Sequence, residues 1–154
     1  MIHYSSMVTI KRRPGDVFAA LLDPERYAQW TPMVDTRFHD TEPRVGTRGD
    51  FRFETGPLKG RYAMEIVALD PARRLDFRVD GSSLRWNAQI GLEPDGDAGT
   101  RMTYAGDLAL LGWRRLLEPL FAREIRSGEA REAEQLRDVL EAEVPAGATA
   151  PARA

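Results

Sequence analysis

Between residues 34 and 108, apolar and polar residues alternate in short runs that are separated by turns rich in glycine and proline. Alternation with a period of two is typical of strands with one buried face, and short turns join antiparallel neighbours. The segment therefore predicts an antiparallel meander. One parity is apolar and comprises Phe51, Phe53, Tyr62, Met64, Ile66, Leu75, Phe77, Val79, Leu84, Trp86, Ala88, Ile90, Met102, Tyr104 and Leu108. The other parity is largely charged, so the apolar face needs a covering partner.

Residues 112–143 carry the only long helical pattern, and we expect this helix to cover the sheet. Pro119 predicts either a kink or a helix that effectively begins near Glu118. Gly128 removes bulk from the inward side, which permits close strand approach or open space. The inward stripe is Leu117, Phe121, Ile125, Gly128, Glu132, Leu136 and Val139, with Leu116, Leu120 and Leu140 beside it.

The segment from Pro14 to Val34 predicts two short helices between the first strand and the meander. Apolar residues at 17, 18, 21 and 22 share one helical face. Pro24 follows Asp23 as the first residue of the second helix, where its missing N–H does no harm. The predicted order is strand, helix, helix and then the meander.

Length and composition exclude several classes of protein. We expect one domain over residues 1–143 and a disordered tail over 144–154, because the tail is rich in alanine, proline and glycine without periodicity. No apolar run or charged leader indicates membrane insertion or export, so we expect a cytoplasmic location. With a net charge of −2, the protein has no overall electrostatic field that would attract nucleic acid. The absence of cysteine excludes disulfides and thiolate sites.

The order of these elements resembles the START/Bet-v-1-like helix-grip superfamily (SRPBCC), in particular its group of polyketide cyclases, dehydrases and lipid-transport proteins. The resemblance extends from about Met7 to Glu143. It rests on Pro14 with Val17-Phe18, Asp23-Pro24-Glu25 through Trp30, Gly46-Thr47, Leu69-Asp70-Pro71, Arg73-Arg74-Leu75 with Phe77, and the terminal helix. It implies an α+β fold in which a curved antiparallel sheet of six to seven strands wraps around the C-terminal helix. It also implies a hydrophobic cavity between them, but no shared catalytic motif.

Large apolar side chains supply the candidate ligand-binding residues. Aromatic rings offer apolar area, and phenol or indole groups can orient a ligand by a hydrogen bond. Tyr62 and Tyr104 are the side chains that we expect to meet a polar ligand atom, and we also place Trp113 in the wall. The main candidates are Trp30, Met33, Phe51, Phe53, Tyr62, Met64, Trp86, Tyr104, Leu117 and Phe121.

Acid and base groups are scarce on the inward parity. Glu132 falls on the apolar stripe of the long helix, and if it is buried there its pKa would be raised and it could transfer protons. If the stripe rotates slightly, Glu132 lies at its solvated edge instead. We expect the solvated position, and we expect the same of Glu124 and Glu129. His3 and His39 are expected at the surface or in structural roles. We expect no metal site and no cofactor, because the two histidines lie far apart and no ligand motif is present.

The sequence therefore predicts a protein that binds a hydrophobic small molecule, which is aromatic, polyketide-like or lipid-like. One alternative is a polyketide cyclase or dehydratase in which Tyr62, Tyr104 or Glu132 assists proton transfer. Another is a protein-interaction module that uses the charged sheet face or the long helix. A monomer and a homodimer remain open, and the catalytic residues of an enzyme are not identified.

Overall fold

A computed structural model describes residues 1–143, and the expected tail at 144–154 lies outside the described residues. Seven antiparallel strands form one sheet in the order β1-β7-β6-β5-β4-β3-β2. The helical elements are α1 (Pro14–Leu21), the 3₁₀ helices η1 (Pro24–Gln29) and η2 (Gly112–Leu117), and α2 (Glu118–Ala142). The strands are β1 (Ile2–Ile10), β2 (Val34–Phe38), β3 (Arg48–Phe53), β4 (Gly60–Asp70), β5 (Arg74–Asp80), β6 (Leu84–Asp95) and β7 (Gly99–Leu110).

Strands β2 to β7 form the predicted meander, and β1 adds to it from the start of the chain. Ile2 of β1 pairs with Leu108 of β7, and the register continues to Ile10 opposite Thr100. The strand begins at Ile2, ahead of Met7, where the resemblance was expected to begin. The two short helices lie between β1 and β2 as predicted, although the second is a 3₁₀ helix. The predicted α+β helix-grip fold is confirmed.

The predicted sheet faces are confirmed, although one outward residue is buried. Phe51, Ile66 and Leu75 on the inward parity are fully buried. Asp76 has the outward parity but is only 5% exposed. Its carboxylate accepts hydrogen bonds from the Arg74 guanidinium, at 2.5 Å from Nη2. Alternation therefore assigned Asp76 to the correct face. It could not predict that a neighbouring arginine would cover this residue.

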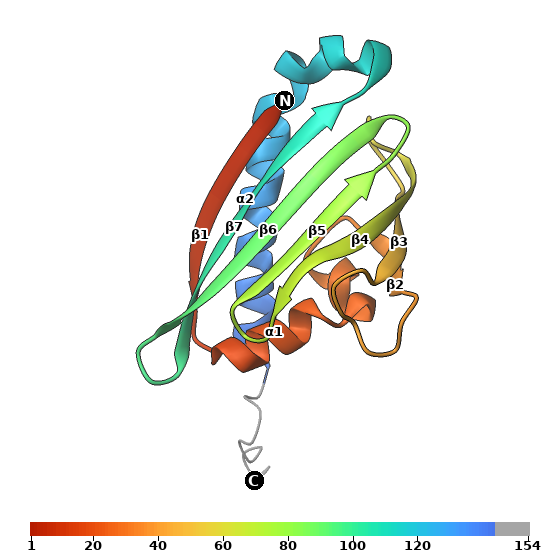
Figure 1. Cartoon of the computed structure of the whole chain (residues 1–154). Coiled ribbons are helices and arrows are strands. Elements are labelled where there is room, and N and C mark those ends of the chain that lie inside the picture. The colour runs from red at the N-terminus through yellow and green to blue at the C-terminus, as the bar shows by residue number, and fades with distance from the viewer. Residues whose placement is uncertain (144–154) are drawn as a thin grey trace, which may run out of the picture.

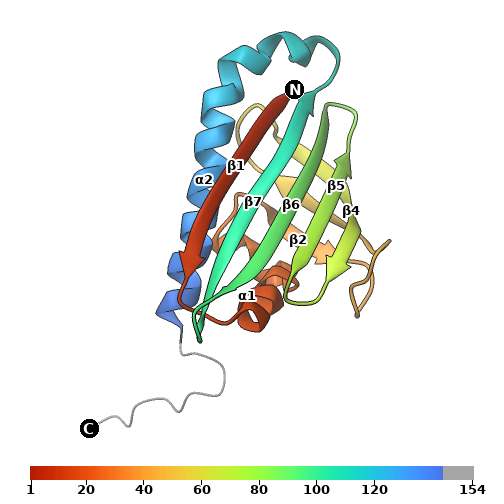
Figure 2. The same ribbon diagram turned by 60° about the vertical axis from the view of Figure 1, so that its left-hand side comes forward.

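Helix α2 lies against the inner face of the sheet near β1 and β7, and α1 closes one end (Figures 1 and 2). The α-helix begins at Glu118 with Pro119 in its first turn, so the second expectation for that proline is confirmed. Leu136 and Leu140 are buried in the core. The region around the start of α2 differs from the prediction, because Leu116 in η2 and Leu120 in α2 are 82% and 74% exposed. Their side of the helix faces away from the sheet.

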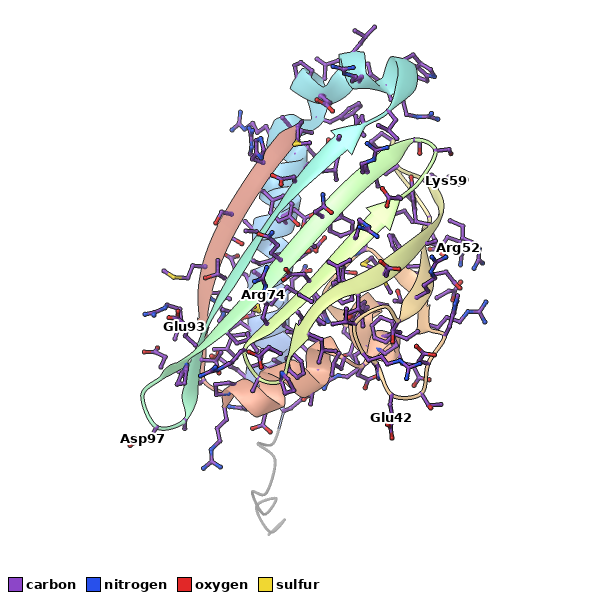
Figure 3. The ribbon with its side chains drawn as sticks, viewed as in Figure 1. Glu42, Arg52, Lys59, Arg74, Glu93 and Asp97 are labelled. Carbon is purple, nitrogen blue, oxygen red and sulfur yellow. The ribbon has the colours of Figure 1, made fainter. Side chains whose placement is uncertain are left out.

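Charged side chains cover the outer face of the sheet and the loops (Figure 3). Arg52 pairs with Asp35 and Glu54, and the Arg78 guanidinium lies 2.9 Å from Glu65. Figure 3 places Glu42 and Asp97 at the tips of loops. Ion pairs between arginines and carboxylates of neighbouring strands recur across this face, for example Arg78 with Glu65 and Arg85 with Asp80.

Candidate functional site

A cavity of about 280 Å³ lies between the sheet and the first half of α2. Strands β6 and β7 contribute Leu84, Trp86 and Leu108 to one wall. The β3–β4 loop, residues 55–58, forms one side of the mouth. Helix α2 supplies the opposite wall, which consists of Phe121, Glu124, Ile125, Gly128, Glu129, Arg131 and Glu132.

The sequence left two possible roles for Gly128, close strand approach or open space, and the structure has the second. The glycine lines the cavity, and a Cβ atom built on it would meet no other heavy atom within 4 Å. The missing side chain therefore leaves open space instead of allowing a strand to approach. A larger residue here would project into the cavity without a backbone clash.

Eight of the ten predicted binding residues line one or both of two spaces. Met33, Phe53, Trp86 and Phe121 line the main cavity. The remaining ones line a second, interior space of about 30 Å³. Its lining includes Trp30, Met33, Phe51, Met64, Trp86 and Tyr104. Met33 and Trp86 border both spaces, so these two side chains stand between the main cavity and the interior one.

Tyr62 and Leu117 line neither of these spaces. The Tyr62 hydroxyl donates a hydrogen bond of 2.8 Å to the Leu58 carbonyl in the β3–β4 loop. That bond ties the loop to β4 and occupies the group that we expected to meet a ligand. Trp113, expected in the wall, is 67% exposed. It lies in η2, where the Arg114 guanidinium stacks over its ring at 5.2 Å from the centroid, and so its expected place in the cavity is wrong.

Two carboxyl groups on α2 line the main cavity, which corrects the expectation that both are solvated. Glu129 and Glu132 are 8% and 9% exposed. One turn of helix separates them, so both point toward the sheet. Glu124, one turn earlier, lines the mouth and is exposed as expected.

Burial dominates the proton affinity of this pair. It raises the pKa of Glu129 to about 7, although hydrogen bonds with Tyr104 and Glu132 act in the opposite direction. Burial also raises the pKa of Glu132 well above its ordinary value, and the charge on Glu129 raises it further. Two neighbouring carboxyls in a poorly solvated site cannot both ionise easily. Near neutral pH the pair therefore retains a proton between its two members.

Two tyrosines and a tryptophan connect the carboxyl pair to the sheet. The Tyr104 hydroxyl on β7 donates to Glu132 Oε2 at 3.4 Å. The Trp86 indole N–H on β6 donates to the Tyr4 hydroxyl at 2.9 Å. The Tyr4 and Tyr104 rings meet edge to face with centroids 5.5 Å apart. Burial raises the pKa of both phenols, so each stays neutral and able to donate a hydrogen bond.

Gly106 makes the position of Tyr4 possible. A Cβ atom at Gly106 would lie 2.5 Å from the Tyr4 hydroxyl and would also collide with the Asn87 carbonyl oxygen. Only glycine permits this close approach of side chain and strand. Tyr4 was not among the predicted site residues, since the parity of the first strand was uncertain from the sequence.

The histidines lie outside the site. His3 and His39 are exposed and contact Asp107 and Asp50, as a surface role predicts. Within residues 1–143, no three histidine, aspartate or glutamate side chains cluster in a way that could hold a metal ion. In the same part of the chain, no helix has the length and apolar character needed to cross a membrane.

A family model described as polyketide cyclase/dehydrase and lipid transport matches residues 1–141. The chain belongs to this family. The expected membership of the group of polyketide cyclases, dehydrases and lipid-transport proteins is thereby confirmed. No curated protein matches the sequence significantly.

Solved structures of low identity share the fold of this family member. A protein from Thermus thermophilus has a TM-score of 0.75 at 20% identity, with 92% of this chain and 99% of that chain covered. A START superfamily protein from Mycobacterium smegmatis has a TM-score of 0.69 at 14% identity, with 92% and 96% covered. DynU16, from the dynemicin biosynthetic locus, has a TM-score of 0.67 at 20% identity, and the coverage is 92% and 48%.

Proposed function

We propose that the protein binds an apolar small molecule, which is aromatic, polyketide-like or lipid-like, between the sheet and α2. The observation that carries this proposal is the cavity of about 280 Å³, with Met33, Trp86, Leu108, Phe121 and Ile125 in its walls. An engineered cavity of roughly 150 Å³ accommodates benzene. The space therefore suits two fused rings, or one ring with a short chain.

The architecture of the walls favours entry of a ligand from solvent. The mouth lies between the β3–β4 loop and α2, and it has exposed residues such as Pro57 and Glu124 on its two sides. Apolar side chains lie deeper, and the carboxyl pair supplies the polar group that small-molecule sites use to orient a ligand. Membership of a family described by both cyclases and lipid transport supports the same class of ligand.

Binding can be tested with a neutral probe of the right size, 2-(naphthalen-1-yl)ethanol, by isothermal titration calorimetry. We expect saturable binding by the wild-type protein. Gly128→Phe should abolish binding by filling the space, whereas Gly128→Ala should retain it, because a methyl group meets no neighbour within 4 Å. Equal binding by the two variants would place the probe elsewhere and overturn the proposal.

A second candidate function is proton transfer on the bound molecule, as in a cyclase or dehydratase. One observation favours it: Tyr104 and Glu132 are in contact beside the cavity, and the raised pKa keeps Glu132 protonated near neutral pH. A carboxyl group in this state can act as a general acid toward a carbonyl oxygen. The group would act on a substrate that the apolar walls hold in a reactive conformation.

The enzyme candidate has its own experiment. Ligand that remains bound during gentle purification is detected by native mass spectrometry, extracted and incubated with fresh protein. Turnover by the wild-type protein that Glu132→Gln abolishes, with the affinity for the ligand retained, would support catalysis. A ligand that both proteins return chemically unchanged would show binding without chemistry.

A further inference from the structure

Glu129 and Glu132 form a carboxyl pair that has no cationic partner. Among residues 1–143, neither makes an ion pair with arginine, lysine or histidine. No basic side chain lowers the pKa of either group. Removing carboxylates from water is costly unless an opposite charge accompanies them. The pair therefore lacks the opposite charge that would stabilise its ionised form.

One oxygen of the pair also lacks a hydrogen-bonding partner. Glu129 Oε2 is buried and accepts no hydrogen bond, whereas Glu132 Oε2 faces the Tyr104 hydroxyl. Buried polar atoms without partners are rare, and each calls for an explanation such as a catalytic role or a bound ion. Glu129 also lines the main cavity, so a molecule bound there lies within reach of it.

The other ionisable groups around the pair do not supply the missing charge. From the sheet, Tyr4 and Tyr104 face it, and both phenols are neutral because burial raises the pKa of each. On α2, Arg131 and Glu124 lie exposed at the mouth and oppose each other in sign. Arg126 and His3 line a smaller space on the β1 side that Glu129 also borders. Both have other partners there, because the Arg126 Nε donates to the His3 carbonyl at 2.8 Å and the His3 ring contacts Asp107.

We propose that the ligand of this cavity carries a protonated amine that binds between Glu129 and Glu132, with its apolar body against Trp86, Leu108, Phe121 and Ile125. The inference rests on the proposed binding function and specifies the ligand class. An ammonium group brings N–H donors to the unpartnered Glu129 oxygen and a positive charge to the pair. A carboxylate or phosphate ligand would instead add a like charge to a poorly solvated site.

The amine changes the protonation of the pair when it binds. It displaces the shared proton, because the ionised carboxylates bind an ammonium better than the protonated acids do. Affinity should therefore rise between pH 5.5 and 8, while an alkylamine with a pKa near 10 stays charged throughout. Calorimetry in two buffers of different ionisation enthalpy should detect release of the proton.

The test compares three probes that share one ring system: 2-(naphthalen-1-yl)ethylamine, 2-(naphthalen-1-yl)ethanol and naphthalen-1-ylacetate. At pH 8 we expect the amine to bind roughly 10- to 100-fold more tightly than the alcohol, since hydrogen bonds to charged groups are the stronger ones. The acetate should bind most weakly. Glu129→Gln and Glu132→Gln should each reduce the preference for the amine at least about fivefold.

A matched control is available at the cavity mouth. Glu124→Gln removes the same charge from an exposed side chain one turn away, and solvent screening should limit its effect on amine affinity to about twofold. Equal affinity for amine and alcohol, or an affinity for the amine that falls as the pH rises, would overturn the inference and leave the binding function standing. Failure of all three probes to bind the wild-type protein would overturn the binding function itself.

Discussion

The Tyr104 hydroxyl on β7 and the Glu132 carboxyl on α2 lie 3.4 Å apart, and their contact connects the sheet to the helix beside the cavity. This separation exceeds the usual range of about 2.5–3.0 Å for an O–H···O hydrogen bond. Glu132 therefore holds the hydroxyl only weakly. The same weakness means that the contact adds little to the stability of the empty protein.

Replacing Tyr104 with phenylalanine tests that assessment. Tyr104→Phe should change the free energy of unfolding by less than about 1 kcal/mol, because the lost hydrogen bond is long. Loss of the hydroxyl should also raise the pKa of Glu132, since the hydroxyl lowers it. Urea denaturation measures the first effect and carboxyl-carbon NMR titration the second. A loss of several kcal/mol would show that the hydrogen bond is strong.

The buried pair should make stability depend on pH in an unusual direction. The pKa of Glu129 is about 7 in the folded protein, compared with 4.5 for an exposed glutamate, so the folded state binds more protons between these values. Stability is therefore greatest below about pH 5 for this group and falls as the pH rises through 7. The pKa difference corresponds to roughly 3 kcal/mol. The raised pKa of Glu132 extends the loss to higher pH.

Urea titrations between pH 5 and 8 should show this decline, and Glu129→Gln should flatten it. Asp50 and Glu118 do not interfere, because the pKa of each is lowered and both titrate below this window. Stability that rises across the window, or an unchanged slope in the Gln variant, would contradict the burial of Glu129 that the structure shows.

Gly106 should be intolerant of a methyl group. In Gly106→Ala the new Cβ would lie 2.5 Å from the Tyr4 hydroxyl and collide with the backbone of β6. We expect a loss of about 1–3 kcal/mol, which is typical of overpacking. The hydrogen bond from Trp86 to Tyr4 should also be disturbed, which tryptophan fluorescence can follow. Gly91→Ala on β6 is the control, because its Cβ meets nothing within 4 Å and should cost less than about 0.5 kcal/mol.

Two leucines of α2 should differ sharply although they share one helix. Leu136 is 1% exposed and lies in the core, so Leu136→Ala should cost about 2–5 kcal/mol. Leu120 is 74% exposed, and Leu120→Ala should change stability by no more than about 0.5 kcal/mol. Chemical denaturation of the two variants side by side measures the difference. Similar losses for both would mean that another surface covers Leu120 in solution.

The fold was predictable because period-two alternation and turn residues act locally. The parity that placed Phe51 and Trp86 inward follows directly from strand geometry. Pro119 left two possibilities for the long helix, a kink or a start near Glu118, and the structure has the second. These features need only the residues that are neighbours in the chain.

The site was harder to predict because it depends on how α2 rotates against the sheet. Ile125, Glu129, Glu132 and Leu136 recur at helical spacing, so the signal for a buried carboxyl pair was present. The predicted stripe included Gly128 in place of Glu129. This difference of one residue left Glu129 outside the predicted stripe. The hydrogen bond of Tyr62 could not be predicted for a different reason: the conformation of the β3–β4 loop places its acceptor, the Leu58 carbonyl.

The pairing of β1 with β7 has a consequence for how the protein is made. Ile2 and Leu108 lie side by side in the sheet, but nearly the whole meander separates them in the chain. During synthesis β1 therefore has no partner until β7 has left the ribosome, and α2 follows only after that. Contacts so distant in sequence slow folding, because the loop between them must close first. The unpaired edge of β1 is then the segment most in need of protection from aggregation while translation proceeds.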